Sequence, residues 1–153
     1  GVEDWEACMQ EMEACRAELR KEGQEVTLPP FGCIVDMPSA ALLAGELIEH
    51  GAQMLAIDIE DLTRYTLGLV QDPAAAATRV GNPAVQRLVR DVVVQARAHN
   101  VETYLCGITV ESMPYIPVYL HLGIHTFSVE PAALLPLKKL LMEQELDPAS
   151  GEP

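Results

Sequence analysis

The stretch QMLAIDIEDLTRYTL, residues 53–67, contains the pattern that decides the fold. Its first five residues, Gln53–Ile57, form a short apolar run without alternation, which is typical of a strand buried on both faces of a parallel sheet. Acidic residues follow at once, and a short helix is expected from about Glu60 to Leu69. The stretch therefore predicts one strand–helix unit with carboxylates at its junction.

Units of the same kind are predicted on both sides of this stretch. The other strands are expected near residues 31–36, 102–106 and 124–129, and a helix over residues 2–22 precedes them. The remaining helices are expected at 38–50, 83–99, 112–122 and 131–145, with an alanine-rich loop at 72–81. Right-handed crossovers make consecutive strands parallel neighbours. Two architectures satisfy this order: a small open α/β sheet, and half of an eight-stranded (β/α) barrel.

The composition indicates one folded domain with an acidic surface. The chain has 153 residues, of which 49% are hydrophobic, and a formal net charge of −13. This charge argues against nucleic acid or an anionic membrane surface as the main partner. There is also no run of eighteen apolar residues that could span a bilayer. We expect a domain over residues 1–146 and a flexible tail over residues 147–153.

The cysteines and the first residue bear on the cellular setting. Four cysteines are present, and their spacing forms neither a disulfide framework nor a zinc motif. This favours a reducing, cytoplasmic location. Gly1 stands where a natural chain would begin with Met, which suggests that parts of the natural protein are missing.

Candidate functional residues follow the predicted strands, because ligand sites in parallel α/β folds lie at the carboxyl ends of the strands. The side chains expected there are Asp36, then Asp58, Glu60 and Asp61, then Cys106, and finally Ser128 with Glu130. Clustered carboxylates favour a hard divalent cation such as Mg²⁺. The alternative is that they are solvated loop residues and helix caps. Cys106 could meet a ligand or be an inert core thiol, and we expect Arg64 to pair with Glu60 four residues earlier.

Several ungapped motifs in this order resemble a known family. Residues 32–40, GCIVDMPSA, match Gly-x-Met-x-Glu-x-Pro-x-Ala, and residues 59–67, IEDLTRYTL, match Thr-Asn-Asp-Leu-Thr-Gln-Tyr-Thr-Leu. Residues 83–88, PAVQRL, match Pro-Ala-Val-x-Arg-Leu, and Cys106-Gly107 matches a Cys-Gly-Glu motif. The sequence resembles the C-terminal phosphoenolpyruvate (PEP)-binding barrel of the PEP-utilising enzymes. It is nearest to enzyme I of the bacterial sugar phosphotransferase system (phosphoenolpyruvate-protein phosphotransferase), with pyruvate phosphate dikinase and PEP synthase more distant.

The resemblance implies a fold and a set of roles. The fold is α/β, the second half of a (β/α)8 TIM barrel. Cys106 corresponds to the catalytic proton donor to the enolpyruvate carbon, and Asp36 and Asp61 correspond to the metal ligands, with Mg²⁺ expected to bind weakly. Glu60, Asp61 and Gln71 fall at substrate-binding positions. The implied partners are PEP and a histidine phosphocarrier protein.

The departures from the family pattern fall on these same positions. Asp36 replaces a Glu, Glu60 replaces an Asn, Val70-Gln71 replaces an Asp-Arg pair, and Ile108 replaces a Glu. Because the lost Arg grips the substrate phosphate and Glu60 adds negative charge, we expect a catalytically impaired phosphotransferase domain that does not turn over PEP. Two other functions stay open: a non-catalytic assembly or regulatory domain, and a metal-dependent keto-acid lyase on the same scaffold.

Half of a barrel leaves a sheet edge and apolar surface uncovered. We therefore expect the chain to pair as a two-fold homodimer. The alternative is that it is a fragment whose missing half normally covers this surface.

Overall fold

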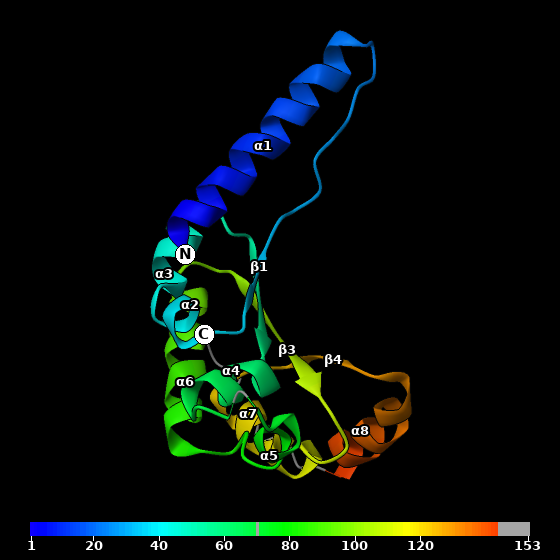
Figure 1. The fold of residues 1–153 in the computed structure, drawn as a ribbon. Coiled ribbons are helices and arrows are strands. Elements are labelled where there is room, and N and C mark those ends of the chain that lie inside the picture. The colour runs from blue at the N-terminus through cyan, green and yellow to red at the C-terminus, as the bar shows by residue number, and fades with distance from the viewer. Residues whose placement is uncertain (70, 144–153) are drawn as a thin grey trace.

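The computed structural model describes residues 1–69 and 71–143, and it contains a parallel sheet of four strands in sequential order (Figure 1). The strands are β1 (Cys33–Val35), β2 (Met54–Asp58), β3 (Glu102–Ile108) and β4 (Thr126–Val129). Each new strand is added on the same side of the last, in the order β1-β2-β3-β4. A doubly wound open sheet would reverse direction at a switch point, whereas a barrel does not. The predicted half-barrel is therefore confirmed, and the sheet is not closed.

One face of the sheet forms the core and the other is only partly covered. Val35, Ile57 and Leu105 are partners in register and are completely buried. On the opposite face, the neighbouring residue Ile34 is 61% exposed. The prediction of strands buried on both faces is thus wrong for this face, since Ile34 is exposed and the side chains of Met54, Ala56 and Asp58 on β2 are only partly buried. In a closed barrel this face would line the interior.

The helices largely follow the predicted order. They are α1 (Val2–Lys21), α2 (Pro38–Leu42), α3 (Ala44–Glu49), α4 (Ile59–Thr66), α5 (Pro73–Ala77), α6 (Pro83–Ala98), the short 3₁₀ helix η1 (Met113–Tyr115), α7 (Ile116–Leu122) and α8 (Pro131–Glu143). Asn82 caps α6 as expected, since its side chain accepts a hydrogen bond from Ala84 N at 2.9 Å. Gly123 ends α7 in the left-handed conformation, with φ 96°.

Three helix predictions need correction. The helix expected at 38–50 is two helices, broken at Leu43. The alanine-rich loop contains α5, because Asp72 caps it through Ala75 N at 3.0 Å and alanine has the highest helix propensity. Ser112 does not cap a helix, because its hydroxyl exchanges hydrogen bonds with the backbone of Thr109, and η1 intervenes before α7.

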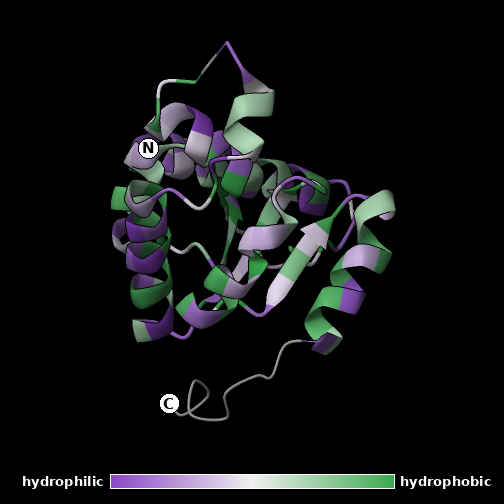
Figure 2. Ribbon diagram, turned by 90° about the horizontal axis from the view of Figure 1, so that it is seen from below, coloured by the Kyte–Doolittle hydropathy of each residue, from purple (hydrophilic) through white to green (hydrophobic). Residues whose placement is uncertain are grey.

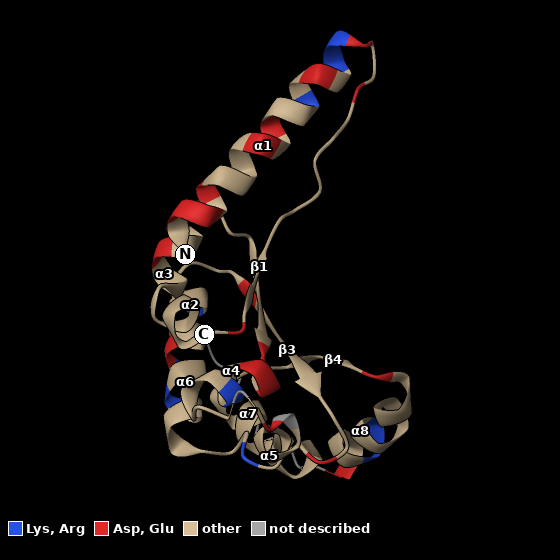
Figure 3. Ribbon diagram, in the orientation of Figure 1, with Lys and Arg blue, Asp and Glu red and all other residues tan. Residues whose placement is uncertain are grey.

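Helix α1 projects away from the rest of the chain and is attached near its N-terminal end (Figure 1). Trp5 is its buried residue, and the indole Nε1 donates to the carbonyl oxygen of His50 at 2.9 Å. The His50 ring also lies 3.2 Å from the Glu6 carboxylate. Most of the charged side chains along α1 are acidic, with basic ones toward its far end (Figure 3).

The outer strands β1 and β4 each have one neighbour within the described sheet, so both edges are open. Helix α8, beside β4, carries green apolar segments in Figure 2, and its Leu134, Leu135 and Met142 are exposed. These are the surfaces that the half-barrel prediction leaves uncovered. None of the helices within residues 1–69 and 71–143 is long and apolar enough to cross a membrane. The tail predicted at 147–153 lies outside the described residues.

Candidate functional site

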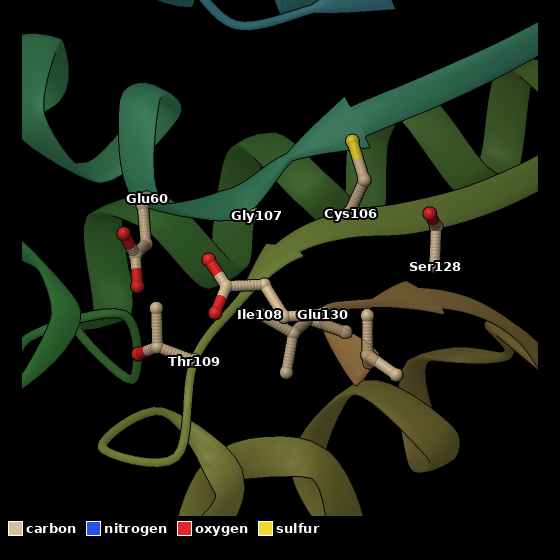
Figure 4. Close-up of a pocket in the computed structure, with 8 residues that line it drawn as sticks. Glu60, Cys106, Gly107, Ile108, Thr109, Ser128 and Glu130 are labelled. Atoms are coloured by element: carbon tan, nitrogen blue, oxygen red, sulfur yellow. The ribbon is translucent and has the colours of Figure 1, made fainter. Parts of the chain in front are cut away.

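A cavity of about 320 Å³ opens at the carboxyl ends of β3 and β4 (Figure 4). It is lined by Glu60, Cys106, Gly107, Ile108, Thr109, Ser128, Val129 and Glu130. Four residues singled out from the sequence thus come together here: Glu60 from α4, Cys106 from β3, Ser128 from β4, and Glu130 directly after β4. In Figure 4 the Cys106 and Ser128 side chains point the same way from adjacent strands.

Asp58 lies beside Cys106, because the two residues are partners in register at the ends of β2 and β3. Its carboxylate also caps α4, accepting a hydrogen bond from Asp61 N at 3.0 Å. From the sequence, Asp58 was one of the clustered carboxylates that favour a divalent cation, with helix capping as the alternative, and the structure shows that it caps α4. The signal that could have found it is its position three residues before Asp61, which is the spacing of a helix cap.

The Cys106 thiol is held in its protonated form. Burial, followed by the negative charges of Asp58 and Asp61, raises the pKa of Cys106 to about 11. At neutral pH the side chain is therefore a thiol and not a thiolate. Such a group can donate a proton but is a poor nucleophile.

Asp61 forms an ion pair that the sequence assigned elsewhere. Its Oδ1 lies 2.7 Å from Nη2 of Arg64, so the predicted pair between Arg64 and Glu60 is wrong. The reason is the geometry of α4, on which residues three apart are also neighbours. Arg64 further stacks over the Tyr65 ring, with its guanidinium carbon 5.0 Å from the ring centroid.

Asp61 and Asp36 both act electrostatically on Asp58 at the end of β2. Burial is the main cause of the raised pKa of Asp58, and the charges of Asp61 and Asp36 raise it further. Carboxylate oxygens are the ligands that Mg²⁺ prefers, and it commonly takes one or two from protein and the rest from substrate and water. The donor chemistry of Asp36 and Asp61 fits such an ion. Within residues 1–69 and 71–143, no group of three or more His, Cys, Asp or Glu side chains is arranged to hold a metal by itself.

The charge of the cavity is negative. Glu60 and Glu130 both line it, and Figure 4 shows their side chains extending toward the same region. Burial raises the pKa of Glu60, assisted by Asp58, Glu111 and Asp61, while the Thr109 hydroxyl acts in the opposite direction. None of the described lining residues is Lys or Arg.

Gln71 is exposed and is not among the residues that line the cavity. It follows α4 in the chain, and its neighbour Val70 lies outside the described residues. The structure therefore brings Glu60, Cys106, Ser128 and Glu130 into one cavity and leaves Gln71 on the surface. Asp61 and Asp36 are close enough to act on Asp58.

Comparison with known proteins agrees with the motifs. The family model described as "PEP-utilising enzyme, PEP-binding domain" matches residues 1–146. The phosphoenolpyruvate synthase of Pyrococcus furiosus is 27% identical over 135 residues, which is 84% of this chain and 16% of that protein. The phosphoenolpyruvate-protein phosphotransferase of Staphylococcus carnosus is 30% identical over 133 residues, 85% of this chain and 23% of that protein.

This chain thus spans less than a quarter of the length of either relative. The family match nevertheless covers nearly all of its residues, and it confirms the resemblance that the motifs at residues 32–40, 59–67 and 83–88 predict. The chain belongs to the PEP-binding domain family of the PEP-utilising enzymes.

Proposed function

We propose that this chain is the second half of a PEP-binding barrel in a phosphoenolpyruvate-protein phosphotransferase of the enzyme I type, with Cys106 as the proton donor. The observation that supports this role is the position of Cys106, a protonated thiol lining a cavity at the strand ends. In the step, the S–H bond of Cys106 breaks and a C–H bond forms at carbon three of enolpyruvate, giving pyruvate. The resulting thiolate regains its proton from water.

Asp36 and Asp61 are the proposed ligands of Mg²⁺, which when bound would neutralise phosphate and carboxylate charge on the substrate. Asp36 has one methylene less than the Glu of the family motif, so it reaches less far. Asp61 is also engaged with Arg64 at 2.7 Å. Both features weaken metal binding, and they support the expectation of low affinity.

Calorimetric titration with Mn²⁺ is expected to give a weak binding heat that is lost in Asp61→Ala. The loss follows because the variant removes one of two carboxylate ligands. Asp72→Ala is the matched control, since it removes an Asp that caps α5 and takes no part in the proposed metal site. Identical heats from wild type and Asp61→Ala would contradict the assignment.

We further propose that this chain by itself is catalytically impaired. PEP carries several negative charges, and the cavity presents Glu60 and Glu130 to it with no basic side chain among the described lining residues. A proton donor acts only on a substrate that is held in position. The test is to incubate the chain with PEP, Mg²⁺ and a histidine phosphocarrier protein, where we expect no pyruvate above the rate without the chain.

A second candidate is a non-catalytic assembly or regulatory domain, which the uncovered surfaces favour. Ile34 on the inner face and Leu135 on α8 are 61% and 75% exposed, and both outer strands have a free edge within the described sheet. Such surfaces mark sites of association. In this role the domain would pair through them as a two-fold homodimer.

Light scattering at high micromolar concentration is therefore expected to give about twice the chain mass of 16.7 kDa. Ile34→Lys should shift the population toward the monomer, because it places a charge on the exposed inner face. Arg90→Ala, a change at an exposed charged side chain on α6, serves as a surface control because α6 is not part of the proposed interface. A clean monomer of wild type at this concentration would contradict the homodimer.

A further inference from the structure

The short link between α5 and α6, residues 78–82, is held by two tyrosine side chains from a later part of the chain. Tyr115 in η1 donates a hydrogen bond from its hydroxyl to the carbonyl oxygen of Thr78 at 3.0 Å. The hydroxyl of Tyr119 in α7 donates to the carbonyl oxygen of Val80. These two bonds join the connection that follows β2 to the connection that follows β3.

The two tyrosines also pack closely on the link. A Cβ on Gly81 would stand 2.3 Å from two ring carbons of Tyr115, so the ring lies directly on the glycine backbone. Tyr119 and Val80 are each 1% exposed. Removal of the Tyr119 hydroxyl would therefore leave the Val80 carbonyl without this hydrogen bond in a place that water does not reach.

The same tyrosines are joined to a wall of the cavity through the turn before η1. Thr109, which lines the cavity, donates its backbone N–H to Ser112 Oγ at 2.9 Å, and this hydroxyl donates back to the Thr109 carbonyl oxygen at 2.9 Å. Ser112 is 2% exposed, and its own carbonyl oxygen accepts from Tyr115 N at 3.0 Å. Hydrogen bonds therefore run from Thr109 through Ser112 and Tyr115 to the link.

The link leads in the other direction to the opposite wall of the cavity. It follows α5, and α5 packs against α4, the helix that carries Glu60. In Figure 4 the side chains of Glu60 and Thr109 point toward one another from these two connections. The tyrosines thus join the two backbone segments that place Glu60 and Thr109 in the cavity lining.

We infer that Tyr115 and Tyr119 are positioning residues that clamp the connection after β2 to the connection after β3, and so hold the Glu60 and Thr109 walls of the cavity in a fixed relation. The inference rests on the proposed function, because a substrate must be held in position before a proton donor can act on it. Neither tyrosine is among the described residues that line the cavity, so both act through the backbone.

The test is amide hydrogen exchange, measured residue by residue by NMR. The reporters of the link are the N–H groups of Arg79 and Asn82, which donate to Ala76 O at 2.8 Å and to Arg79 O at 2.9 Å. In Tyr119→Phe we expect both to exchange about tenfold faster, because a buried hydrogen bond that closes the link is lost. Exchange at the Thr109 amide should rise with them, by a similar factor.

Two further variants weaken the clamp in other ways. Tyr115→Phe is expected to speed the same amides by about threefold, since Tyr115 is only partly buried and water can replace its hydroxyl. Gly81→Ala keeps both hydroxyls and displaces the Tyr115 ring by its methyl group, so it should also speed exchange across the link. These variants keep the inference testable if Tyr119→Phe fails to fold.

Tyr104→Phe is the matched control, because it removes a tyrosine hydroxyl that donates to Glu102 Oε2 at 2.7 Å and takes no part in the clamp. It should leave exchange at Arg79, Asn82 and Thr109 unchanged. The amides of Val89 and Val92, on the buried face of α6, report the stability of the whole domain and should keep their wild-type rates in the clamp variants.

Unchanged exchange at Arg79 and Asn82 in the clamp variants would show that the tyrosines do not hold the link, and this overturns the inference. Faster exchange there with an unchanged Thr109 amide also overturns it, because the cavity wall would then be independent of the link. So does an equal acceleration at Val89 and Val92, which would be a general loss of stability. The measurement uses no PEP and no metal, so failure counts against the clamp, while the pyruvate assay bears on the proposed function.

Discussion

The double variant Glu60→Asn, Gln71→Arg is expected to bind PEP about a hundredfold more tightly than the wild-type chain. Glu60→Asn removes a carboxylate from the cavity lining. Gln71→Arg restores the guanidinium that the family motif has at this position, and a charge-assisted contact contributes about tenfold or more in affinity. Calorimetry or phosphorus NMR titration with PEP measures the change, and the two single variants divide it between the sites.

Glu11→Gln on the exposed face of α1 is the control for a general charge effect, since it removes a charge far from the cavity lining. Gln71 lies outside that lining, so its Arg replacement must reach the ligand through its longer side chain. If the double variant bound PEP no more tightly than wild type, the weak binding of PEP would have a cause other than Glu60 and Gln71. A similar gain in Glu11→Gln would assign the effect to net charge.

Leu105→Ala is expected to lower the free energy of unfolding by about 2–5 kcal/mol. Leu105 is completely buried in β3, where it has Ile57 and Phe127 as partners in register. Truncation leaves a cavity at the middle of the sheet, and the loss is a large part of the stability of a typical domain. Urea denaturation measured by circular dichroism provides the value.

The control is Leu42→Ala on α2, the same truncation at a side chain that is 70% exposed. Leu42→Ala should change the free energy of unfolding by no more than about 0.5 kcal/mol. Equal losses of unfolding free energy in Leu105→Ala and Leu42→Ala would contradict the burial of Leu105 in a packed core.

Much of the fold could be predicted because its signals are local. The apolar runs that end at Asp36 and Asp58 predict strands from composition alone, and Asn82-Pro83 and Gly123 mark helix ends by conformational preference. The choice of half a barrel over another open sheet came from the family motifs. The sequential strand order agrees with that choice.

The missed features depend on contacts between segments distant in sequence. The position of Asp58 beside Cys106 depends on the register of β2 with β3, which no local pattern specifies. Arg64 could reach an acid either three or four residues earlier, and spacing alone does not distinguish Asp61 from Glu60. The exposure of Ile34 depends on whether another part of a barrel covers the inner face of the sheet. The apolar sequence of the strand is the same whether that face is covered or open.

Pyruvate release from PEP with Mg²⁺ and a histidine phosphocarrier acceptor, measured for wild type and Cys106→Ala side by side, decides whether the domain is catalytically impaired. We predict that both proteins release pyruvate at the rate of the protein-free control, because Cys106 retains its proton but the cavity around it repels the anionic substrate. Pyruvate formed by wild type and not by Cys106→Ala would contradict this account, since it would show that the altered site still turns over PEP.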